Sequence, residues 1–303
     1  MRKAFCNEIL KRVDLSSVVL FTGDLGYGAF ESLRDRMGER FINAGVAEQN
    51  MVSMAAAFTK LGYEAWVYSI APFVFARPFE QLRNDVSFQG LPVKLVGNGG
   101  GYPYGVMGPS HHALEDYGVL LTLPGFKIFL PSFDEDLEEV VPAAAACPSP
   151  TYLRLGISYK PTEYKLPPYG QWRQLLVGDG PVLLTAGSLT GIYLREFMGE
   201  PQDSRPNLWA VSELPFTAKD LPINLLEQVN RSRRLIIAEE HVAQGGIASQ
   251  ICTQLLAIGV GMISVTCFQA ASKINKRYGS HQFMLEQDGL IGEVITAVRA
   301  SSM

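Results

Sequence analysis

The stretch F-I-N-A-G-V-A-E-Q-N-M-V-S-M-A-A-A-F, residues 41–58, indicates how the chain folds. It passes from an apolar, strand-like start through Gly45 into a run of Ala, Met and Val that is typical of a helix. One carboxylate, Glu48, lies in this run, and no basic residue follows it until Lys60. The segment therefore predicts a strand–helix unit that contains an acid without an evident partner.

Two interpretations of Glu48 are open at this point. An acid in the first turn of a helix is stabilised by the helix dipole. The apolar surroundings, however, predict burial, and a buried, unpaired carboxylate is costly and tends to keep its proton. Such a group can instead hydrogen-bond a basic ring nitrogen and exchange a proton with it in a water-poor cleft.

Composition excludes several classes of protein. With 303 residues, of which 47% are apolar, the chain is long enough for two packed domains. The net charge of −4 argues against a nucleic-acid or anionic-membrane surface. No apolar run is long enough for a membrane span or follows the N-terminal charges as in a signal peptide. The four cysteines form no C-x-x-C pair, which predicts reduced thiols, no zinc site and a cytoplasmic location.

Short β-rich runs alternate with helical patterns in the first half of the chain. The expected strands are Ser17–Phe21, Arg40–Asn43, Glu64–Tyr68, Val93–Val96, Lys127–Leu130 and Tyr152–Leu155. The expected helices lie near Arg2–Val13, Val46–Leu61, Pro72–Phe88, Ala113–Leu121 and Phe133–Ala146. This alternation predicts βαβ units and a parallel sheet with helices on both faces.

Residues 156–178 interrupt the alternation with three prolines and no clear period, which predicts a linker. Beyond it we expect strands at Pro181–Ala186, Leu208–Val211, Arg234–Ala238 and Met262–Thr266. The expected helices are Leu189–Met198, Leu221–Val229, Ile247–Ile258 and a last one from Leu290. The fold class is thus α/β, with two doubly wound, mostly parallel-sheet domains at 1–160 and 179–303 and a linker at 161–178.

Ligands of open parallel sheets bind at the carboxyl ends of the strands. One such loop is T-G-D-L-G-Y-G at 22–28, and a second is the glycine-rich loop, N-G-G-G-Y-P-Y-G-V-M-G-P-S-H-H at 98–112. We expect Asp24, Glu48 and His111 to converge at this edge. The two adjacent histidines point about 100° apart if they start a helix, so one can face the cleft and the other the protein.

Five blocks resemble, in order, the C-terminal half of transketolase and cover nearly the whole chain. They are N-A-G-V-A-E-Q-N-M-V-S-M-A-A-A-F, Y-S-I-A-P-F-V-F-A-R-P-F-E-Q-L-R-N-D-V, G-P-S-H-H-A-L-E-D, P-T-Y-L-R-L-G and I-I-A-E-E-H-V-A-Q-G-G-I-A-S-Q-I. The resemblance implies a pyrimidine-binding domain of thiamine diphosphate enzymes, followed by the transketolase C-terminal domain. Deoxyxylulose phosphate synthase and the β subunits of 2-oxo acid dehydrogenases share this architecture.

The resemblance also implies a role and a partner. A chain that begins at the pyrimidine-binding domain looks like the β-type subunit of a split transketolase of carbohydrate metabolism. It would move a two-carbon ketol unit from a ketose or its phosphate to an aldehyde. The Mg²⁺ ligands and a G-D-G…N motif are expected on a partner chain, in an α₂β₂ heterotetramer. Gly178–Gly180 with Asn207 mimics that motif, but it precedes its strand and so lies away from the ligand edge.

The resemblance assigns cofactor contacts residue by residue. Glu48 matches the catalytic acid that hydrogen-bonds N1′ of the aminopyrimidine. Phe73 matches an aromatic ring that packs on this pyrimidine, and Ile70 stands at a neighbouring position that is often Phe. Asp24 and Leu25 match residues after the first strand that contact the cofactor.

Substrate contacts are implied in the same way. His111 matches a catalytic histidine that meets substrate oxygens, and Arg154 matches an arginine that grips phosphate. Gly99 and Met107 depart from the family, because transketolases carry a histidine and an acid there that meet the ketose donor.

Two rivals stay open beside the transketolase assignment. One is the β subunit of a 2-oxo acid decarboxylase or dehydrogenase, although the blocks A-E-Q-N-M and E-Q-L-R-N-D look more like transketolase. The other is a non-catalytic assembly subunit with the same fold. The presence of Glu48 and His111 argues against it, whereas Gly99 and Met107 keep it open.

Overall fold

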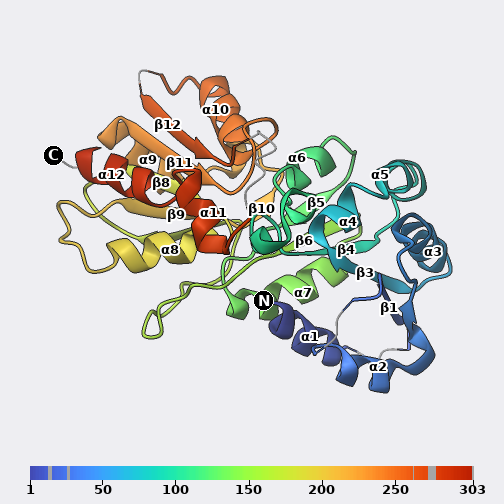
Figure 1. The fold of residues 1–303 in the computed structure, drawn as a ribbon. Helices are drawn as coiled ribbons and strands as arrows, with labels where there is room; N and C mark the ends of the chain where they lie inside the picture. The colour runs from blue at the N-terminus through green and yellow to red at the C-terminus, as the bar shows by residue number, and fades with distance from the viewer. Residues whose placement is uncertain (13–15, 26–27, 262, 272–277, 302–303) are drawn as a thin grey trace.

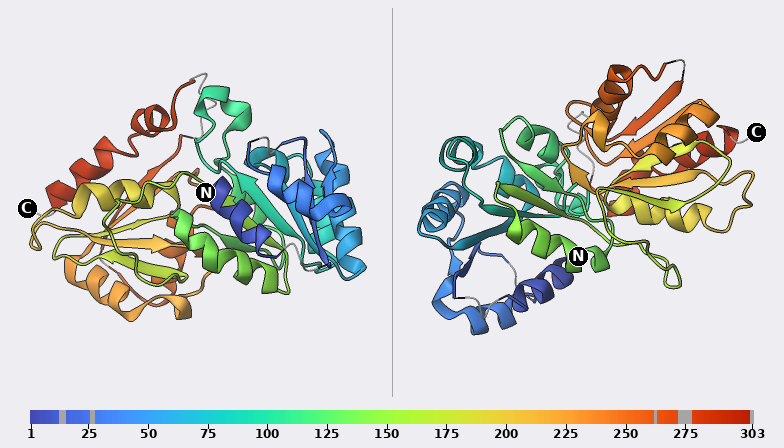
Figure 2. Two further views of the ribbon diagram at one scale, coloured as in Figure 1. Left: turned by 90° about the horizontal axis from the view of Figure 1, so that it is seen from below. Right: turned by 180° about the vertical axis from the view of Figure 1, so that it is seen from behind.

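The computed structural model describes residues 1–12, 16–25, 28–261, 263–271 and 278–301, which form two β-sheets flanked by helices (Figure 1). Figure 2 shows from two further sides that the second sheet, drawn in yellow to red, lies beside the first. The α/β class with mostly parallel sheets is confirmed. The exact domain boundaries stay a prediction.

The first sheet has seven strands in the order β10-β5-β6-β4-β3-β1-β2. They are β1 Val18–Thr22, β2 Phe41–Asn43, β3 Glu64–Ile70, β4 Lys94–Asn98, β5 Lys127–Phe129, β6 Thr151–Leu155 and β10 Glu213–Leu214. All neighbours are parallel except β10, which pairs antiparallel with β5. Since β10 comes from the second half of the chain, the two halves share this sheet.

Helices cover both faces of the first sheet because its strands are apolar on both sides. Val18 and Leu20 of β1 face α1 (Arg2–Leu10), α2 (Glu31–Met37) and α7 (Leu137–Ala146). Val19 and Phe21 face the other side. The helices there are α3 (Glu48–Lys60), α4 (Ala71–Phe75) and α6 (Asp116–Leu120). Residues alternate across a strand, so the all-buried pattern of β1 is what two covered faces require.

The second sheet has five strands in the order β12-β11-β8-β9-β7. They are β7 Trp172–Leu176, β8 Val182–Thr185, β9 Asn207–Val211, β11 Arg234–Glu239 and β12 Ser264–Gln269. The helices are α8 Ser188–Phe197, α9 Ile223–Ser232, α10 Ile247–Ala257, α11 His281–Gln287 and α12 Gly292–Ser301. All pairings are parallel except that of β7 with β9.

The structure differs from the expected elements in a few places. The expected linker contains β7, an edge strand whose polar start hides its alternation. The expected helix 72–88 is divided into α4, α5 (Phe79–Gln81) and a π-helical turn, Leu82–Ser87, because Pro78 lacks the N–H that a continuous helix needs. The sequence pattern does not reveal α2 or α11. Val13 and Met262, at the ends of an expected helix and an expected strand, lie outside the described residues.

Lys94 predicts a pH dependence of stability. Its Nζ is buried and donates to the carbonyl oxygens of Cys147 and Ser149 at 2.5 and 3.4 Å. Burial lowers the pKa of Lys94 from 10.5 to about 8. The unfolded chain then binds more protons between these values, so the free energy of unfolding should rise with pH across that window. Urea unfolding at several pH values should show this rise in the wild type.

The variant Lys94→Met is the matched comparison. It keeps the length of the side chain but has no proton to bind. The difference in stability between the two proteins should therefore shrink steadily as the pH rises from about 8 towards 10.5. A difference that stays constant across this window would show that Lys94 keeps an ordinary pKa.

None of the helices in the described part of the chain is long and apolar enough to cross a membrane.

Candidate active site

Glu48 is the first residue of α3 and is only 5% exposed. The chain turns into the helix at Gly45, whose φ of 67° is the left-handed conformation that glycine adopts without strain. The carboxylate is not alone, since Arg77 donates from Nη1 to Oε1 of Glu48 at 2.8 Å. The sequence pattern does not point to Arg77, because 29 residues separate the two and a broken helix brings them together.

Arg77 also stacks on an aromatic ring. Its guanidinium lies 3.8 Å from the ring centroid of Phe73 in α4. Edge-on to that ring stands the imidazole of His111, with 5.1 Å between the centroids. Glu48, Phe73 and His111, which come from three separate parts of the chain, therefore meet around one arginine, itself 44% exposed.

A buried hydroxyl without a partner lies beside this group. Ser69, near the end of β3, has an Oγ that finds no hydrogen-bond partner within the described chain. A Cβ placed on Gly23 would lie 3.4 Å from this Oγ and 3.8 Å from Oε1 of Glu48. Ile70 follows Ser69 and is also buried, directly before α4. The end of β3 and the loop after β1 thus border the acid.

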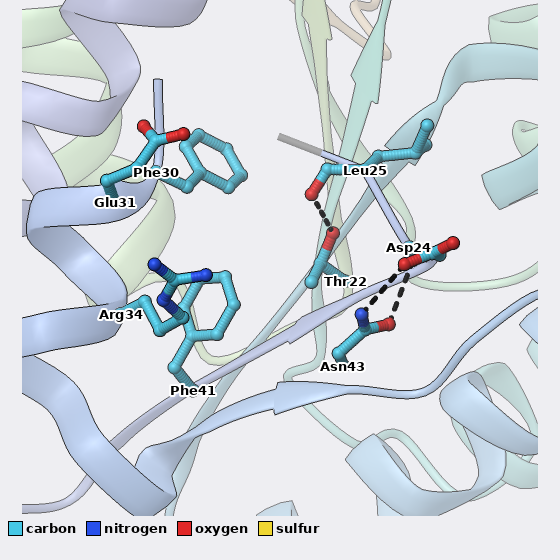
Figure 3. Close-up of a pocket in the computed structure, with 8 residues that line it drawn as sticks. All are labelled: Thr22, Asp24, Leu25, Phe30, Glu31, Arg34, Phe41 and Asn43. Carbon is cyan, nitrogen blue, oxygen red and sulfur yellow. Dashed lines mark hydrogen bonds between the residues drawn. The ribbon is translucent and has the colours of Figure 1, made fainter. Parts of the chain in front are cut away.

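Asp24 and Leu25 lie in the loop after β1, next to Gly23. Asp24 has a left-handed φ of 54°, and it exchanges two hydrogen bonds of 3.0 Å with Asn43 at the end of β2. Leu25 accepts a hydrogen bond from Thr22 at 3.0 Å. Figure 3 shows both residues on the wall of a pocket of ≈ 160 Å³ that reaches α2. Glu48 is not part of that wall, so this pocket adjoins the acid without containing it.

The two adjacent histidines point to different surroundings. His111 closes a short 3₁₀ turn, Pro109–His111, with its Nδ1 3.0 Å from Oγ of Ser110. Burial lowers the pKa of His111, and the positive charge of Arg77 lowers it further. His112 instead packs edge-on against Tyr102, with ring centroids 4.9 Å apart. His111 is therefore the histidine that faces Phe73 and Arg77, with a neutral ring at neutral pH.

Gly99 and Met107 lie on the same loop. Gly99 has a φ of 78°, and a Cβ there would come within 2.3 Å of the ring of Tyr104. The hydroxyl of Tyr104 accepts a hydrogen bond from Nδ2 of Asn98 at 2.6 Å. Tyr104 therefore covers Gly99, while Met107 is half-exposed. Sequence patterns alone give no signal for this tyrosine.

The expected role of Arg154 as a phosphate-gripping residue does not fit its position. Arg154 is buried in β6, and its Nε donates to Asp116 at 2.7 Å. Its Nη2 donates to the carbonyl oxygens of Ala113 and Glu240, each at 2.9 Å. The carboxyl end of β6 is covered by the second half of the chain, which the pattern of a strand end cannot show. Arg154 holds parts of the protein together instead.

This position makes a testable prediction for Arg154→Met. Asp116 would keep only the hydrogen bond from Tyr152, at 2.8 Å, as a buried charge. We expect a loss of about 2–3 kcal/mol in the free energy of unfolding, the range for an under-satisfied buried charged group. Chemical denaturation measures this loss. In a transfer assay, activity should fall by one common factor for donors with and without phosphate. A selective loss with the phosphorylated donor would restore the phosphate-binding role.

The G-D-G segment at 178–180 is tied to Asn207 inside the protein. Oδ1 of Asn207 accepts from the N–H of Gly178 at 3.2 Å, and Nδ2 donates to the carbonyl of Gly180 at 3.1 Å. Asn207 is fully buried. Across the described residues, no group of three or more His, Cys, Asp or Glu side chains could hold a metal ion.

Comparison with known families decides the assignment. The family model described as transketolase, pyrimidine binding domain, matches residues 2–158, which is 157 of the 303 residues. The chain belongs to the transketolase pyrimidine-binding-domain family. The resemblance noted in the sequence is thereby confirmed, and the family implies thiamine diphosphate as the cofactor.

Relatives of this transketolase-family chain include components of divided enzymes. The B component of the two-part apulose-4-phosphate transketolase of Phocaeicola vulgatus is 27% identical over 267 residues, which cover 84% of this chain and 83% of the relative. A 1-deoxy-D-xylulose-5-phosphate synthase of Pelotomaculum thermopropionicum is also 27% identical, over 94% of this chain but only 44% of its own length.

Among solved structures, a split-gene transketolase, described as an inactive β4 tetramer, superposes with a TM-score of 0.81. The match has 24% identity and covers 99% of this chain and 97% of that one. It confirms the fold. The relatives confirm a transketolase-type transferase subunit as the function, in the general sense expected from the sequence.

Proposed function

We propose that this chain is the β-type subunit of a two-component transketolase. It would transfer a two-carbon ketol unit from a ketose or ketose phosphate to an aldehyde. The cofactor would lie between this chain and a partner that binds Mg²⁺ and the diphosphate, in an α₂β₂ assembly. The division of the related P. vulgatus enzyme into named components supports the need for a partner.

The arrangement of Glu48 and Phe73 carries this proposal. A pyrimidine needs a carboxyl group for its ring nitrogen and a flat surface for its face. Arg77 uses both at once, with 2.8 Å to Glu48 and 3.8 Å to the Phe73 centroid. Its guanidinium is planar and rich in N–H donors, so it is a chemical stand-in for an aminopyrimidine. The unpartnered Oγ of Ser69 offers one more polar contact beside them. These residues fit thiamine diphosphate.

The roles of the surrounding residues follow from their positions. Oε1 of Glu48 would hold the proton that is shared with the pyrimidine nitrogen, and burial would keep water from competing for it. Phe73 would orient the ring from one face, while Ile70 would exclude water from the side. Asp24 and Leu25 would border the same ring from the loop after β1. When bound, thiamine diphosphate supplies a nucleophilic carbon that carries the two-carbon unit.

His111 would meet the substrate. Its ring lies next to Phe73 and is neutral at neutral pH, because burial and Arg77 lower its pKa. A neutral imidazole can donate one hydrogen bond and accept another, which suits the hydroxyl and carbonyl oxygens of a sugar. Tyr104 over Gly99 changes the opposite side of the pocket, so donor choice should differ from that of enzymes with a histidine at this place.

We also propose the cytoplasm as the location and carbohydrate metabolism as the setting. Supporting this, all four thiols, Cys6, Cys147, Cys252 and Cys267, are free. Unpaired thiols are usual in a reducing compartment.

The decisive experiment mixes the purified chain with a candidate partner that carries a G-D-G…N motif, Mg²⁺ and thiamine diphosphate. Transfer from ketoses and ketose phosphates to aldehydes is then measured beside release of CO₂ from 2-oxo acids. Ketol transfer that requires both chains supports the proposal. Turnover of 2-oxo acids alone would assign the chain to the decarboxylase or dehydrogenase β subunits. A mixture that takes up no thiamine diphosphate in calorimetry would indicate a non-catalytic assembly role.

A further inference from the structure

The glycine-rich loop, residues 98–112, is closed at its base by the backbone. Gly101 and Ala113 exchange two hydrogen bonds, of 2.9 and 3.0 Å. Glu240, which directly follows β11 of the second sheet, lies at this base and is almost fully buried. Its Oε1 accepts a hydrogen bond from the backbone N–H of Tyr102. A carboxylate of the second sheet is thus bound to the loop that carries His111.

Glu240 is itself held in place. Nε2 of His281, the first residue of α11, lies 2.7 Å from Oε1 of Glu240. Nδ1 of the same ring is 2.8 Å from the hydroxyl of Tyr159. The backbone oxygen of Glu240 accepts from Arg154, which also binds the oxygen of Ala113 at the base of the loop. Both the main chain and the side chain of Glu240 therefore fix the same base.

The glycines of the loop are explained by this close approach. A Cβ on Gly101 would lie 2.3 Å from the carboxyl carbon of Glu240. Gly105 accepts a backbone hydrogen bond from Gly279 at 3.2 Å, and a Cβ there would lie 2.6 Å from the oxygen of Gly279. A Cβ on Gly108 would overlap the ring of Tyr278. The loop is thus shaped against residues 278–284 as well as against Glu240.

A side-chain contact adds a second attachment. The hydroxyl of Tyr102 donates to Oδ2 of Asp288, which also accepts from the N–H of Ala271 at 2.9 Å. The other face of Tyr102 meets His112, the neighbour of His111. Movement of Tyr102 would therefore be passed directly to the two histidines.

We propose that Glu240 is a positioning residue, through which the second sheet sets the place of His111 by fixing the base of the glycine-rich loop. The inference rests on the proposed function, since it gives His111 a substrate to meet. Glu240 itself touches no reacting group. It acts through Tyr102 and the loop, and the second sheet thereby takes part in catalysis at a site formed by the first.

Hydrogen exchange on the isolated chain tests the structural half of the proposal. In Glu240→Ala, amides of residues 101–113 should exchange about 10- to 100-fold faster, the factor for losing one hydrogen bond to a charged group. Glu240→Gln keeps an oxygen acceptor for Tyr102 and should retain most of the protection. Tyr102→Phe, which loses only the Asp288 contact, should show a smaller effect in the same residues. Glu227→Ala, at an exposed position of α9, is the matched control.

Steady-state kinetics with the partner chain test the catalytic half. For Glu240→Ala we expect kcat/KM to fall by about 100-fold, as for a displacement near 1 Å. Binding of thiamine diphosphate, followed by calorimetry, should be unchanged because Glu48 and Phe73 are untouched. Unchanged loop exchange, exchange that rises over the whole chain alike, or full activity of Glu240→Ala would each overturn the inference. An inactive wild type would instead refute the proposed function, while loop exchange would still decide whether Glu240 fixes the loop.

Discussion

Replacing Glu48 by Ala should reduce ketol transfer by about 10²- to 10⁴-fold, the range attributed to a positioned acid–base group. The carboxylate is buried, and no water can take over a proton that must be shared with a ring nitrogen in the same place. Stability should change little, because Arg77, which loses its partner, is 44% exposed and can be hydrated. The measurement is the transfer rate of the reconstituted enzyme at saturating cofactor and partner.

Two further variants sharpen this test. Glu48→Gln keeps the size and one oxygen of the side chain but cannot exchange a proton, so it should be almost as inactive as Glu48→Ala. Glu39→Ala removes an exposed acid and should behave as wild type. Wild-type turnover in Glu48→Gln would remove Glu48 from the mechanism, whatever Glu48→Ala shows.

Replacing Asp136 by Ala should destabilise the protein by about 3–5 kcal/mol, the cost of leaving a buried charge without its partner. Asp136 binds Arg173 of β7 through two hydrogen bonds of 2.7 and 2.8 Å, and both side chains are 2% exposed. The same carboxylate accepts from the backbone N–H groups of Ser132 and Phe133. Urea denaturation of the isolated chain gives the value, with exposed Asp203→Ala as the control.

A double variant separates the charge from the packing. Asp136→Leu combined with Arg173→Met removes both charges and fills similar space. It should recover a large part of the lost stability, since a buried ion pair and an apolar pair of similar volume are often close in stability. A loss below about 1 kcal/mol in Asp136→Ala would mean that water reaches Arg173, as in a surface pair.

The sequence predicts the fold well where hydrophobic patterns are long. The apolar helix after residue 45 predicts the burial of Glu48, because only an interior position suits its Ala and Met residues. Strand ends place His111 on the ligand edge for the same reason. Arg77 could not be predicted, since its contact with Glu48 depends on how a helix is broken by Pro78.

The second sheet explains the remaining differences. Arg154 stands at a strand end, and such a position is normally near solvent, but residues of the second half cover it. In the same way β7 resembles a linker, because the partner of Arg173 lies in a distant helical turn. Contacts between two halves of a chain leave no periodic signal in either half, so neither Arg154 nor Glu240 could be assigned from patterns alone.

The pairing of β10 with β5 bears on how this protein can be divided. Glu213 and Leu214 close the edge of the first sheet by pairing with Phe129 and Ile128. A fragment that ends near residue 160 would expose the backbone of β5, and an open apolar edge is a template for self-association. A soluble minimal fragment should therefore extend at least through Leu214, even though most of the added residues belong to the second sheet.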